Sequence, residues 1–483
     1  MKHLDHNRDQ REMNFDCSKR MRPNSGLVSW LVLLLIALEC ACGVGTQTSP
    51  PPPPPKSAVP TPTVLRTLYR VVNGTDRMTT VGPNERNWYP LEAQTYYVPD
   101  QGAGGQTTLN RVVNSSNTDH ADTTTTLSGY SQDMELGFPW SSSSVPGVAQ
   151  LAESFNSTTG DHALLAPTET IAGYASAPLA AYGYPRYGNS SEVLLSLSAG
   201  GVTVQSNAVA GGATWRWYWN GTQFVNHGDY GREIQGAFYF ETTPLNPTEA
   251  GDFMTMGTLD QSLKHGSPIL RFENQGDTQI TRAIPLEWDP TQHGGDQDHP
   301  VIWDTLVLGK DLTLNYQNLG PVAQYTTHLV LPAATKGTLA DPAGYLPSNF
   351  DRFWTYDAKS KSLTEVTAAM PNGCTPASSG YAFNVDFGGI IMSDASGANA
   401  MGVYGVNLSN GGSTTYFAMW KFDCWGDGAS ETASDNTAWS AVYGNGTDVV
   451  FPAGESTYNV YLITDTVQNV TARMDDLFQI GVR

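Results

Sequence analysis

A period-two alternation of apolar and polar residues constrains the fold more than any other feature of this sequence. It recurs in the segments 202–209 (VTVQSNAV), 214–227 (TWRWYWNGTQFVNH), 305–316 (TLVLGKDLTLNY) and 457–464 (TYNVYLIT). Alternate side chains of a β-strand point to opposite faces, so one face of each segment can be buried while the other is solvated. The sequence therefore predicts a strand in each of these segments.

Turn residues between such segments favour antiparallel pairing. Asn220-Gly221 separates WRWYW from TQFV, and an Asn-Gly pair is the strongest short-range signal for a two-residue hairpin turn. Further Asn-Gly pairs occur at 372–373, 410–411 and 445–446. We expect an all-β fold, a large antiparallel β-sandwich with few short helices, and residues 145–155 (VPGVAQLAESF) are the best helix candidate.

An apolar run near the N-terminus predicts export. Residues 27–38 (LVSWLVLLLIAL) are too short for a spanning helix and match the core of a signal peptide. Cys40 and Cys42 follow, so plain secretion and a lipid-modified N-terminus stay open as alternatives. We interpret 1–45 as a signal peptide or lipoprotein leader. The expected location is extracellular or in the cell envelope, with membrane contact only through an N-terminal lipid anchor.

The rest of the chain is interpreted as one globular region behind a spacer. Residues 46–62 contain a run of prolines, which lack the amide donor of a helix or central strand, so we expect an extended linker. No second linker and no repeat at a fixed period is identified in 63–483. This region is expected to form the β-sandwich, with 63–194 as a candidate sub-domain.

Charge and cysteine content limit the partners and predict one cross-link. The formal net charge of −20, from 26 basic and 46 acidic residues, disfavours binding to the phosphate backbone of nucleic acid. Five cysteines are present, and only Cys374 and Cys424 lie outside the leader. In an exported protein this pair predicts a disulfide, and two separate buried thiols are the alternative.

Segment 215–252 concentrates side chains suited to a polyhydroxylated ligand. Alternate tryptophans on one strand face could stack on sugar rings, or they could fill the core. The polar residues that follow could bind hydroxyl groups and move protons, or they could brace a sheet corner as a self-satisfied network. The substrate-binding candidates are Trp215, Trp217, Trp219 and Gln235. The catalytic candidates are His227, Asp229, Tyr230, Arg232, Glu233 and Glu249.

These candidates divide into two roles. Arg232 and Asp229 would orient the sugar, because a guanidinium and a carboxylate complement hydroxyl groups. Glu233 or Glu249 would transfer a proton together with His227 or Tyr230.

A second polar segment, 291–300 (TQHGGDQDHP), could bind a divalent metal ion through nitrogen and oxygen ligands. Its candidate ligands are His293, Asp296, Asp298 and His299. Their spacing matches no diagnostic pattern, and an ordinary polar surface loop is the alternative. His120 and Asp161-His162 are scattered candidates of the same kind. The sequence lacks the G-x-S-x-G, H-E-x-x-H and phosphate-loop motifs, so the corresponding enzyme classes lose support.

Several segments together resemble a known architecture. WRWYWNG, DYGREIQ and NPTEAG, with AVYGNG and STYNVYLITDTV downstream, resemble uncharacterised secreted bacterial β-proteins that are similar to galactose mutarotases, over about residues 195–483. The resemblance implies a supersandwich fold, also found in modules of polysaccharide lyases, and a sugar as the ligand. Mutarotases use a His and a Glu as acid and base, but no position here aligns with them, so no role is carried over.

The sequence thus predicts an exported carbohydrate-binding or carbohydrate-active protein of the lyase or hydrolase type. The alternative is a non-catalytic cell-envelope β-sandwich with a binding or structural role. A glycan is the expected partner, a divalent metal ion is the candidate cofactor, and catalysis itself stays an open question.

Overall fold

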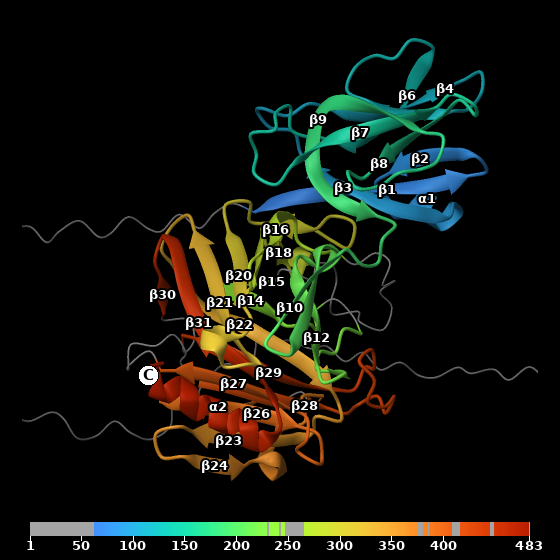
Figure 1. Ribbon diagram of the computed structural model, residues 1–483. Helices are drawn as coiled ribbons and strands as arrows, with labels where there is room; N and C mark the ends of the chain where they lie inside the picture. Colours follow the sequence, from blue (N-terminus) through green and yellow to red (C-terminus); the bar gives the residue numbers. More distant parts are fainter. Residues whose placement is uncertain are drawn as a thin grey trace, which may run out of the picture. The chain divides into compact units, whose positions relative to one another are not determined.

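The computed structural model describes residues 62–228, 231–240, 243–246, 265–374, 380–384, 386–407, 416–444 and 449–482 (Figure 1). All pairs of named strands in this part are antiparallel, and its only α-helices are α1 (Pro83–Trp88) and α2 (Val467–Gln479). The all-β, antiparallel prediction is confirmed. None of the described helices is long and apolar enough to cross a bilayer. The predicted leader, and the predicted linker as far as residue 61, lie outside the described residues.

Residues 62–188, which we call the N-terminal lobe, consist of three similar units of three strands. In each unit the first strand pairs with both the second and the third. The units are β1 (Thr63–Asn73), β2 (Asp76–Thr80) and β3 (Leu91–Pro99); β4 (Leu109–Asn114), β5 (His120–Thr123) and β6 (Tyr130–Gly137); and β7 (Ala149–Asn156), β8 (Asp161–Leu165) and β9 (Ala175–Gly188).

An aspartate at the hairpin of each unit joins the three units in a ring. Asp76, Asp119 and Asp161 are separated by 43 and 42 residues. Each carboxylate accepts a hydrogen bond from the backbone N–H that follows the aspartate of another unit: His120 donates to Asp76 (3.2 Å), His162 to Asp119 (3.2 Å) and Arg77 to Asp161 (3.0 Å). The expectation of no repeat at a fixed period was therefore wrong. The repeat rests on a few turn residues, while the strand residues around them differ.

The predicted helix over 145–155 was also wrong, because most of this segment belongs to strand β7. β7 pairs with β8 on one side and β9 on the other, so its backbone groups bond to neighbouring strands. Tertiary pairing here overrides the local helical spacing of Val148, Leu151 and Phe155.

Residues 189–482, which we call the sandwich region, contain the other three groups of strands. A four-stranded sheet has the order β10 (Leu194–Ala199), β11 (Val202–Asn207), β12 (Ala213–Trp219) and β13 (Thr222–Gln223). A nine-stranded sheet has the order β16 (Ile269–Gln275), β17 (Thr278–Ala283), β20 (Val307–Thr313), β21 (Val322–Leu331), β31 (Gly454–Asp465), β27 (Ala400–Val406), β26 (Phe387–Ser393), β23 (Arg352–Asp357) and β24 (Ser362–Glu365).

The third sheet runs β25 (Tyr381–Asn384), β28 (Tyr416–Phe422), β29 (Asn436–Tyr443), β22 (Thr335–Pro347), β14 (Gln235–Phe240), β15 (Thr243–Asn246), β18 (Leu286–Glu287) and β19 (Val301–Ile302), and continues through β1 into the N-terminal lobe, with β30 (Val450–Phe451) beside β22. One large core joins residues of all three sheets, including Trp217, Leu339, Trp439 and Leu462. Burial along β20 and β21 alternates residue by residue, as the sequence predicts.

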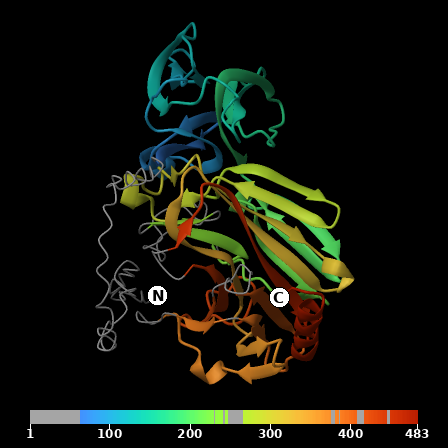
Figure 2. The ribbon, with the colours of Figure 1, turned by 90° about the vertical axis from the view of Figure 1, so that its left-hand side faces the viewer.

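Helix α2 covers the other face of the nine-stranded sheet (Figure 2). Val470, Met474 and Leu477 are its buried residues, and the Thr466 hydroxyl caps it by accepting the N–H of Asn469. A Cβ at Gly402 of β27 would lie 2.3 Å from a Val470 methyl carbon, so glycine permits this close packing. Helix α2 was not predicted from the sequence, although the spacing of its buried residues is helical.

The Asn-Gly hairpin prediction is confirmed at its strongest position. Asn220 and Gly221 have φ values of 48° and 80°, and they connect β12 to β13 with Trp219 opposite Thr222. Both residues are left-handed, as a type I′ turn requires. The pairs at 410–411 and 445–446 lie outside the described residues.

Candidate functional site

The loop between β13 and β14 carries the main group of predicted site residues, and it packs on a second loop that joins β28 to β29. The N–H of His227 donates to the Glu431 carbonyl (2.7 Å). Arg232 Nη1 donates to the carbonyls of Ala433 (3.1 Å) and Ser434 (2.9 Å). The partners are about 200 residues away in the chain, so no local pattern could reveal them. Asp229, Tyr230 and Glu249 lie outside the described residues.

A hollow of about 410 Å³ opens beside the β28–β29 loop and strand β13. Its lining residues are Thr222, Gln223, Pro347, Asn349, Phe350, Ala429, Ser430, Glu431 and Thr432. Hydroxyl, amide and carboxylate groups dominate this set, and such groups exchange hydrogen bonds with polar ligands. The hollow therefore suits a small hydrophilic molecule better than an apolar one.

Glu431 lines the hollow with an exposed carboxylate, and a buried imidazole, that of His227, lies behind this carboxylate. His227 Nε2 lies 3.7 Å from Glu431 Oε1, and the two side chains are 7% and 45% exposed. Nε2 makes no hydrogen bond to any residue that the structure describes. Burial, and then the positive charge of Arg216, lower the pKa of His227. The imidazole is therefore neutral at pH 7 and able to accept a proton.

The residues packed beneath the His227 ring hold it in position. Its ring stacks on the indole of Trp215, with ring centroids 5.2 Å apart. Trp215 Nε1 donates to Glu192 (3.2 Å), and the same carboxylate accepts Arg216 Nη2 (2.7 Å). Burial would raise the pKa of Glu192, but the hydrogen bond and charge of Arg216 and the hydrogen bond from Trp215 together outweigh it and lower that pKa. Glu192 is thus a charged anchor for both residues beneath the imidazole.

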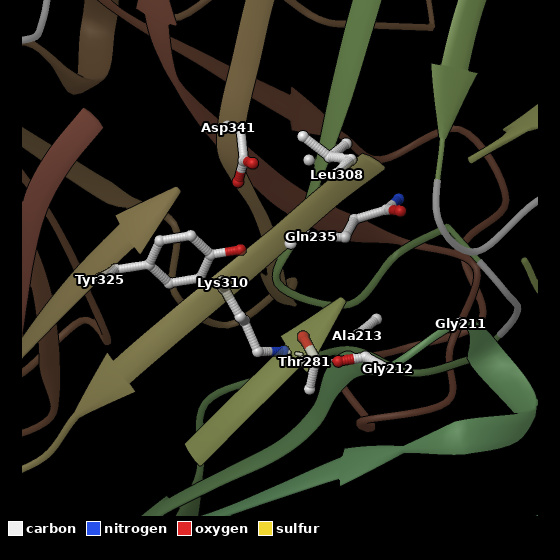
Figure 3. A pocket seen from close by; sticks show the side chains of 11 residues that line it. Gly211, Gly212, Ala213, Gln235, Thr281, Leu308, Lys310, Tyr325 and Asp341 are labelled. Atoms are coloured by element: carbon white, nitrogen blue, oxygen red, sulfur yellow. Dashed lines mark hydrogen bonds between the residues drawn. The ribbon is translucent and has the colours of Figure 1, made fainter. Parts of the chain in front are cut away.

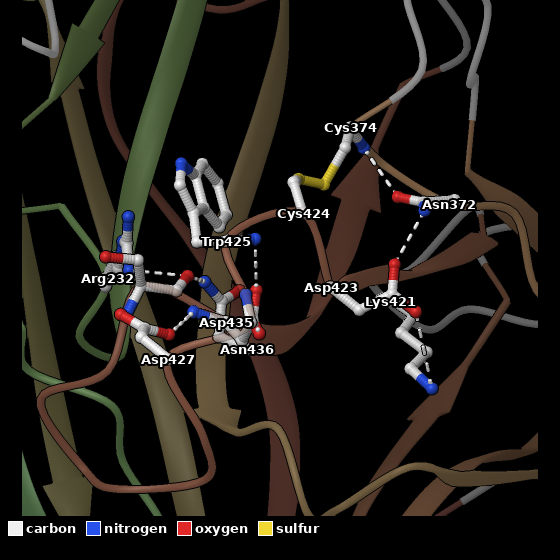
Figure 4. The surroundings of a disulfide bond; sticks show 12 residues. Arg232, Asn372, Cys374, Lys421, Asp423, Cys424, Trp425, Asp427, Asp435 and Asn436 are labelled. Atoms are coloured by element: carbon white, nitrogen blue, oxygen red, sulfur yellow. Dashed lines mark hydrogen bonds and ion pairs between the residues drawn. A yellow bond between two sulfur atoms is a disulfide. The ribbon is translucent and has the colours of Figure 1, made fainter. Parts of the chain in front are cut away.

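The β28–β29 loop is fixed by a disulfide and by two aspartates (Figure 4). Cys374 and Cys424 form the predicted disulfide, with Cα atoms 6.0 Å apart. Asp435 accepts the backbone N–H groups of Trp425 (2.8 Å) and Gly426 (2.7 Å). Asp427 accepts those of Ser434 (2.6 Å) and Asp435 (3.0 Å). These bonds hold the loop in one conformation along most of its length.

The tryptophans predicted to bind substrate lie mostly in the interior. Trp215 is 6% exposed and Trp217 is fully buried, with its indole N–H on the Thr464 hydroxyl (3.3 Å). Trp219 packs at the border of the large core. The exposed indole on the β28–β29 loop belongs instead to Trp425, which sequence patterns did not single out.

Glu233 and Gln235 face the interior as well. Glu233 is fully buried and accepts the N–H of Gly231 (2.7 Å), while Gln235 Nε2 donates to the Gly231 carbonyl (2.7 Å). Gln235 also lines a second, internal pocket between β14, β20, β21 and β22. Neither side chain lines the open hollow.

The internal pocket has a volume of about 20 Å³ and contains a buried lysine and a buried aspartate (Figure 3). Lys310 Nζ donates to the Ser206 hydroxyl (3.0 Å) and the Gly212 carbonyl (2.7 Å). Burial lowers the pKa of Lys310 to about 7, against the opposing effects of Asp341 and Glu233, and burial raises the pKa of Asp341 to about 7. This space holds about one water molecule, so it is too small for a sugar.

The structure does not bring the four predicted metal ligands of segment 291–300 together: Asp296 and His299 pair with each other, and the other two have partners outside the segment. His293 bonds to Glu287 (2.7 Å), His299 bonds to Asp296 (2.7 Å), and Asp298 pairs with Arg86 (2.5 Å). Among the described residues, the one group with ligand atoms close enough for a shared ion is Asp76, Asp119 and Asp161, within 4.8 Å of one another. Those three carboxylates already bind backbone N–H groups in the ring of the N-terminal lobe.

This chain is similar in structure to several solved proteins, but its sequence matches no known family. No protein-family model and no curated protein matches the sequence. Similar solved structures include a GalM/aldose epimerase homologue from C. elegans (10% identity, 57% of this chain and 100% of that chain, TM-score 0.34). Galactose 1-epimerase from Lactobacillus acidophilus is similar at 10% identity, over 58% of this chain and 96% of that chain, with a TM-score of 0.34. 4-alpha-glucanotransferase from Thermococcus litoralis is similar at 8% identity, over 57% and 38%, with a TM-score of 0.26.

Proposed function

We propose that this protein is an exported carbohydrate-binding protein and that the hollow beside His227 and Glu431 is its binding site. The observation that carries the proposal is the pairing of an exposed carboxylate with a buried, neutral imidazole at the edge of a polar hollow. Sugars present many hydroxyl groups, which need both donors and acceptors. Thr222, Asn349 and Glu431 supply both kinds.

The same pair would give the site a catalytic capacity. A ligand hydroxyl in the hollow would donate its proton to the Glu431 carboxylate, and the buried His227 Nε2, 3.7 Å behind it, would take that proton from Glu431 and return it by the same path. Because the pKa of His227 is lowered by its burial, the base form persists to more acidic pH than for a free histidine. Activity that depends on this base would fall only below that lowered pKa.

A specific observation favours a non-catalytic module as the second candidate. Arg232 Nη1 donates hydrogen bonds to two loop carbonyls, and Glu233 is fully buried. Two of the predicted catalytic groups therefore support the loops rather than face the hollow. In this alternative the hollow binds sugar, and the His227–Glu431 pair only shapes it.

Export is part of the proposal. The apolar run 27–38 supports it, and so does the disulfide, because such bonds persist mainly in oxidising compartments. Fractionation of cells that produce the full chain, with mass determination of the mature N-terminus, tests secretion against lipid anchoring. Recovery of the uncleaved chain in the cytoplasm would contradict this part of the proposal.

The binding site is tested with the purified protein on a polysaccharide panel. Retention on each polysaccharide and release of new reducing or unsaturated ends are measured together. Glu431→Gln should weaken retention and abolish any release, whereas the matched variant Glu455→Gln should change neither. Glu455 is also an exposed glutamate beside a histidine, with Oε1 2.6 Å from His328 Nδ1, but it does not line the hollow.

The outcomes separate the two candidate functions. Release that is lost in Glu431→Gln establishes catalysis at the hollow, and retention without release supports the binding module. Retention that is equal in Glu431→Gln and the unsubstituted protein would place binding elsewhere. No retention on any polysaccharide would refute the carbohydrate function.

A further inference from the structure

Trp425 combines exposure with a fixed position. Its side chain is 49% exposed, among the largest values for an aromatic residue in the described part of the chain. Scattered exposed hydrophobic residues are common and need no explanation by themselves. Trp425 differs because its backbone N–H is bound by Asp435 and because its neighbour Cys424 is cross-linked to Cys374.

The indole is also supported by a cation. The Arg232 guanidinium carbon lies 5.6 Å from the Trp425 ring centroid, and Arg232 itself is held by the carbonyls of Ala433 and Ser434. Figure 4 shows Trp425 and Arg232 together with the aspartates of this loop. A rigid aromatic ring loses little conformational entropy when a ligand stacks on it, so this arrangement suits binding.

Trp425 and the lining residues 429–432 of the hollow lie on the same loop, between β28 and β29. Glu431, which lines the hollow, follows Trp425 by six residues, so their Cα atoms are at most about 20 Å apart. Arg232 sets a tighter limit on the distance between the indole and the hollow. Its guanidinium group contacts both the indole and the carbonyl of Ala433, and Ala433 directly follows Thr432, which lines the hollow. An oligosaccharide that starts in the hollow is therefore long enough to reach the indole.

We infer that Trp425 is a stacking platform for an additional sugar unit of the glycan, so the ligand is an oligosaccharide or a polysaccharide chain rather than a monosaccharide. This inference rests on the proposed function of the hollow. The C–H faces of sugar rings are apolar and pack on indole faces, while their hydroxyl edges stay in water. Glu431 and its neighbours would bind one unit, and Trp425 would bind another.

The test measures affinity against ligand length. Calorimetric titrations of the purified full chain use β-1,4-linked gluco- and galacto-oligosaccharides of one to six units, with the corresponding monosaccharides. For the unsubstituted protein, affinity should rise with chain length. Trp425→Ala should remove that rise, a loss of about tenfold for the longer ligands, which corresponds to about one stacking contact. Its affinity for the monosaccharide should stay unchanged.

Three further variants separate the hypotheses. Trp425→Phe keeps an aromatic face and should retain part of the length dependence. Trp88→Ala removes an exposed indole, 73% exposed, in the N-terminal lobe and should have no effect. Glu431→Gln should weaken binding of every ligand, monosaccharide included. Thermal unfolding of each variant establishes that the fold is retained.

The results test two claims, the stacking role of Trp425 and sugar binding in the hollow. Length-dependent affinity that survives in Trp425→Ala, or affinity that does not depend on length, overturns the platform while leaving the hollow intact. Loss of monosaccharide affinity in a folded Trp425→Ala also overturns it, because Trp425 would then belong to the first sugar unit. If the unsubstituted protein binds none of these sugars and no panel polysaccharide, the proposed function fails, and this inference fails with it.

Discussion

The N-terminal lobe and the sandwich region stabilise antiparallel strands by different interactions. The sandwich region packs its sheets around one large apolar core, with Trp217 and Trp439 fully buried in it. The N-terminal lobe has smaller apolar clusters and adds buried ion pairs: Arg70 with Glu92 and Glu169, and Arg111 with Glu85 and Asp133. A unit of three short strands encloses little apolar volume, so polar contacts between units take a larger share.

The three units of the N-terminal lobe also differ from one another at one equivalent buried position. Arg70 and Arg111 occupy equivalent positions and donate to carbonyls of neighbouring hairpins, at Leu164 (2.8 Å) and Thr79 (2.9 Å). The third unit has Glu153 at this position, and its Oε1 accepts the N–H of Asp122 (3.1 Å). A buried carboxyl group thus replaces a buried cation and lies near the buried carboxyl group of Asp122, so the third unit is electrostatically the least favourable of the three.

The largest expected effect tests the apolar core of the sandwich region. Trp439→Ala should lower the free energy of unfolding by about 4 kcal/mol, because it leaves a cavity among well-packed neighbours. Denaturant unfolding monitored by circular dichroism measures it. Trp88→Ala, at an exposed position, should change the free energy by less than about 0.5 kcal/mol. Similar losses in both variants would contradict the assignment of the core.

Removal of the disulfide should have the next largest effect, and only the sandwich region carries a disulfide among the described residues. Cys374→Ser with Cys424→Ser should cost about 3 kcal/mol, because the bond closes a long loop of 50 residues. The double variant should also expose the β28–β29 loop to faster amide exchange. Unchanged exchange at Trp425 and Gly426 would show that the two aspartates fix the loop without the disulfide.

Loss of a buried cation tests the polar contribution to the N-terminal lobe. Arg111→Ala should cost about 2–3 kcal/mol, because it removes the cation that pairs with both Glu85 and Asp133, although both acids are partly solvated. Thermal unfolding monitored within this lobe measures the effect. Arg271→Ala, an exposed ion-pair arginine of the sandwich region, is the control and should be nearly neutral. Equal effects would mean that the lobe gains nothing from burying its arginines.

The smallest expected effect has the opposite sign and depends on pH. Burial, and then the neighbouring Asp122, raise the pKa of Glu153 well above its ordinary value. The stability that protonated Glu153 gives is complete below its unfolded pKa and is lost as the pH rises through its raised folded pKa. Glu153→Gln should therefore stabilise the protein by about 1–2 kcal/mol at pH 8 and by less at pH 5.

Thermal unfolding of Glu153→Gln at a series of pH values measures this gain. Glu135→Gln, an exposed glutamate of the same lobe, should show no pH-dependent difference from the unsubstituted protein. A loss of stability in Glu153→Gln at pH 8 would mean that the ionised carboxylate is favourable, and the third unit would then match the other two.

Local sequence patterns determined the strand content, the Asn220-Gly221 turn and the Cys374–Cys424 pair. Alternation and turn preference depend on residues a few positions apart, so they can be recognised without knowing the fold. Local patterns also failed where a partner strand decided the outcome, as in β7, whose spacing of apolar residues also suits a helix. The three-unit repeat was visible in principle, through the aspartates spaced 43 and 42 residues apart.

Only the tertiary structure decided which residues form the candidate site. His227 and Arg232 were recognisable from the sequence, but their partners Glu431 and Trp425 lie on a loop about 200 residues away. Burial then separated the candidates, because Glu233 and Trp217 point into the interior while Glu431 and Trp425 stay exposed. A sequence states which chemical groups are present, whereas their distances and exposure depend on how remote strands pair, and that pairing is set by the whole chain.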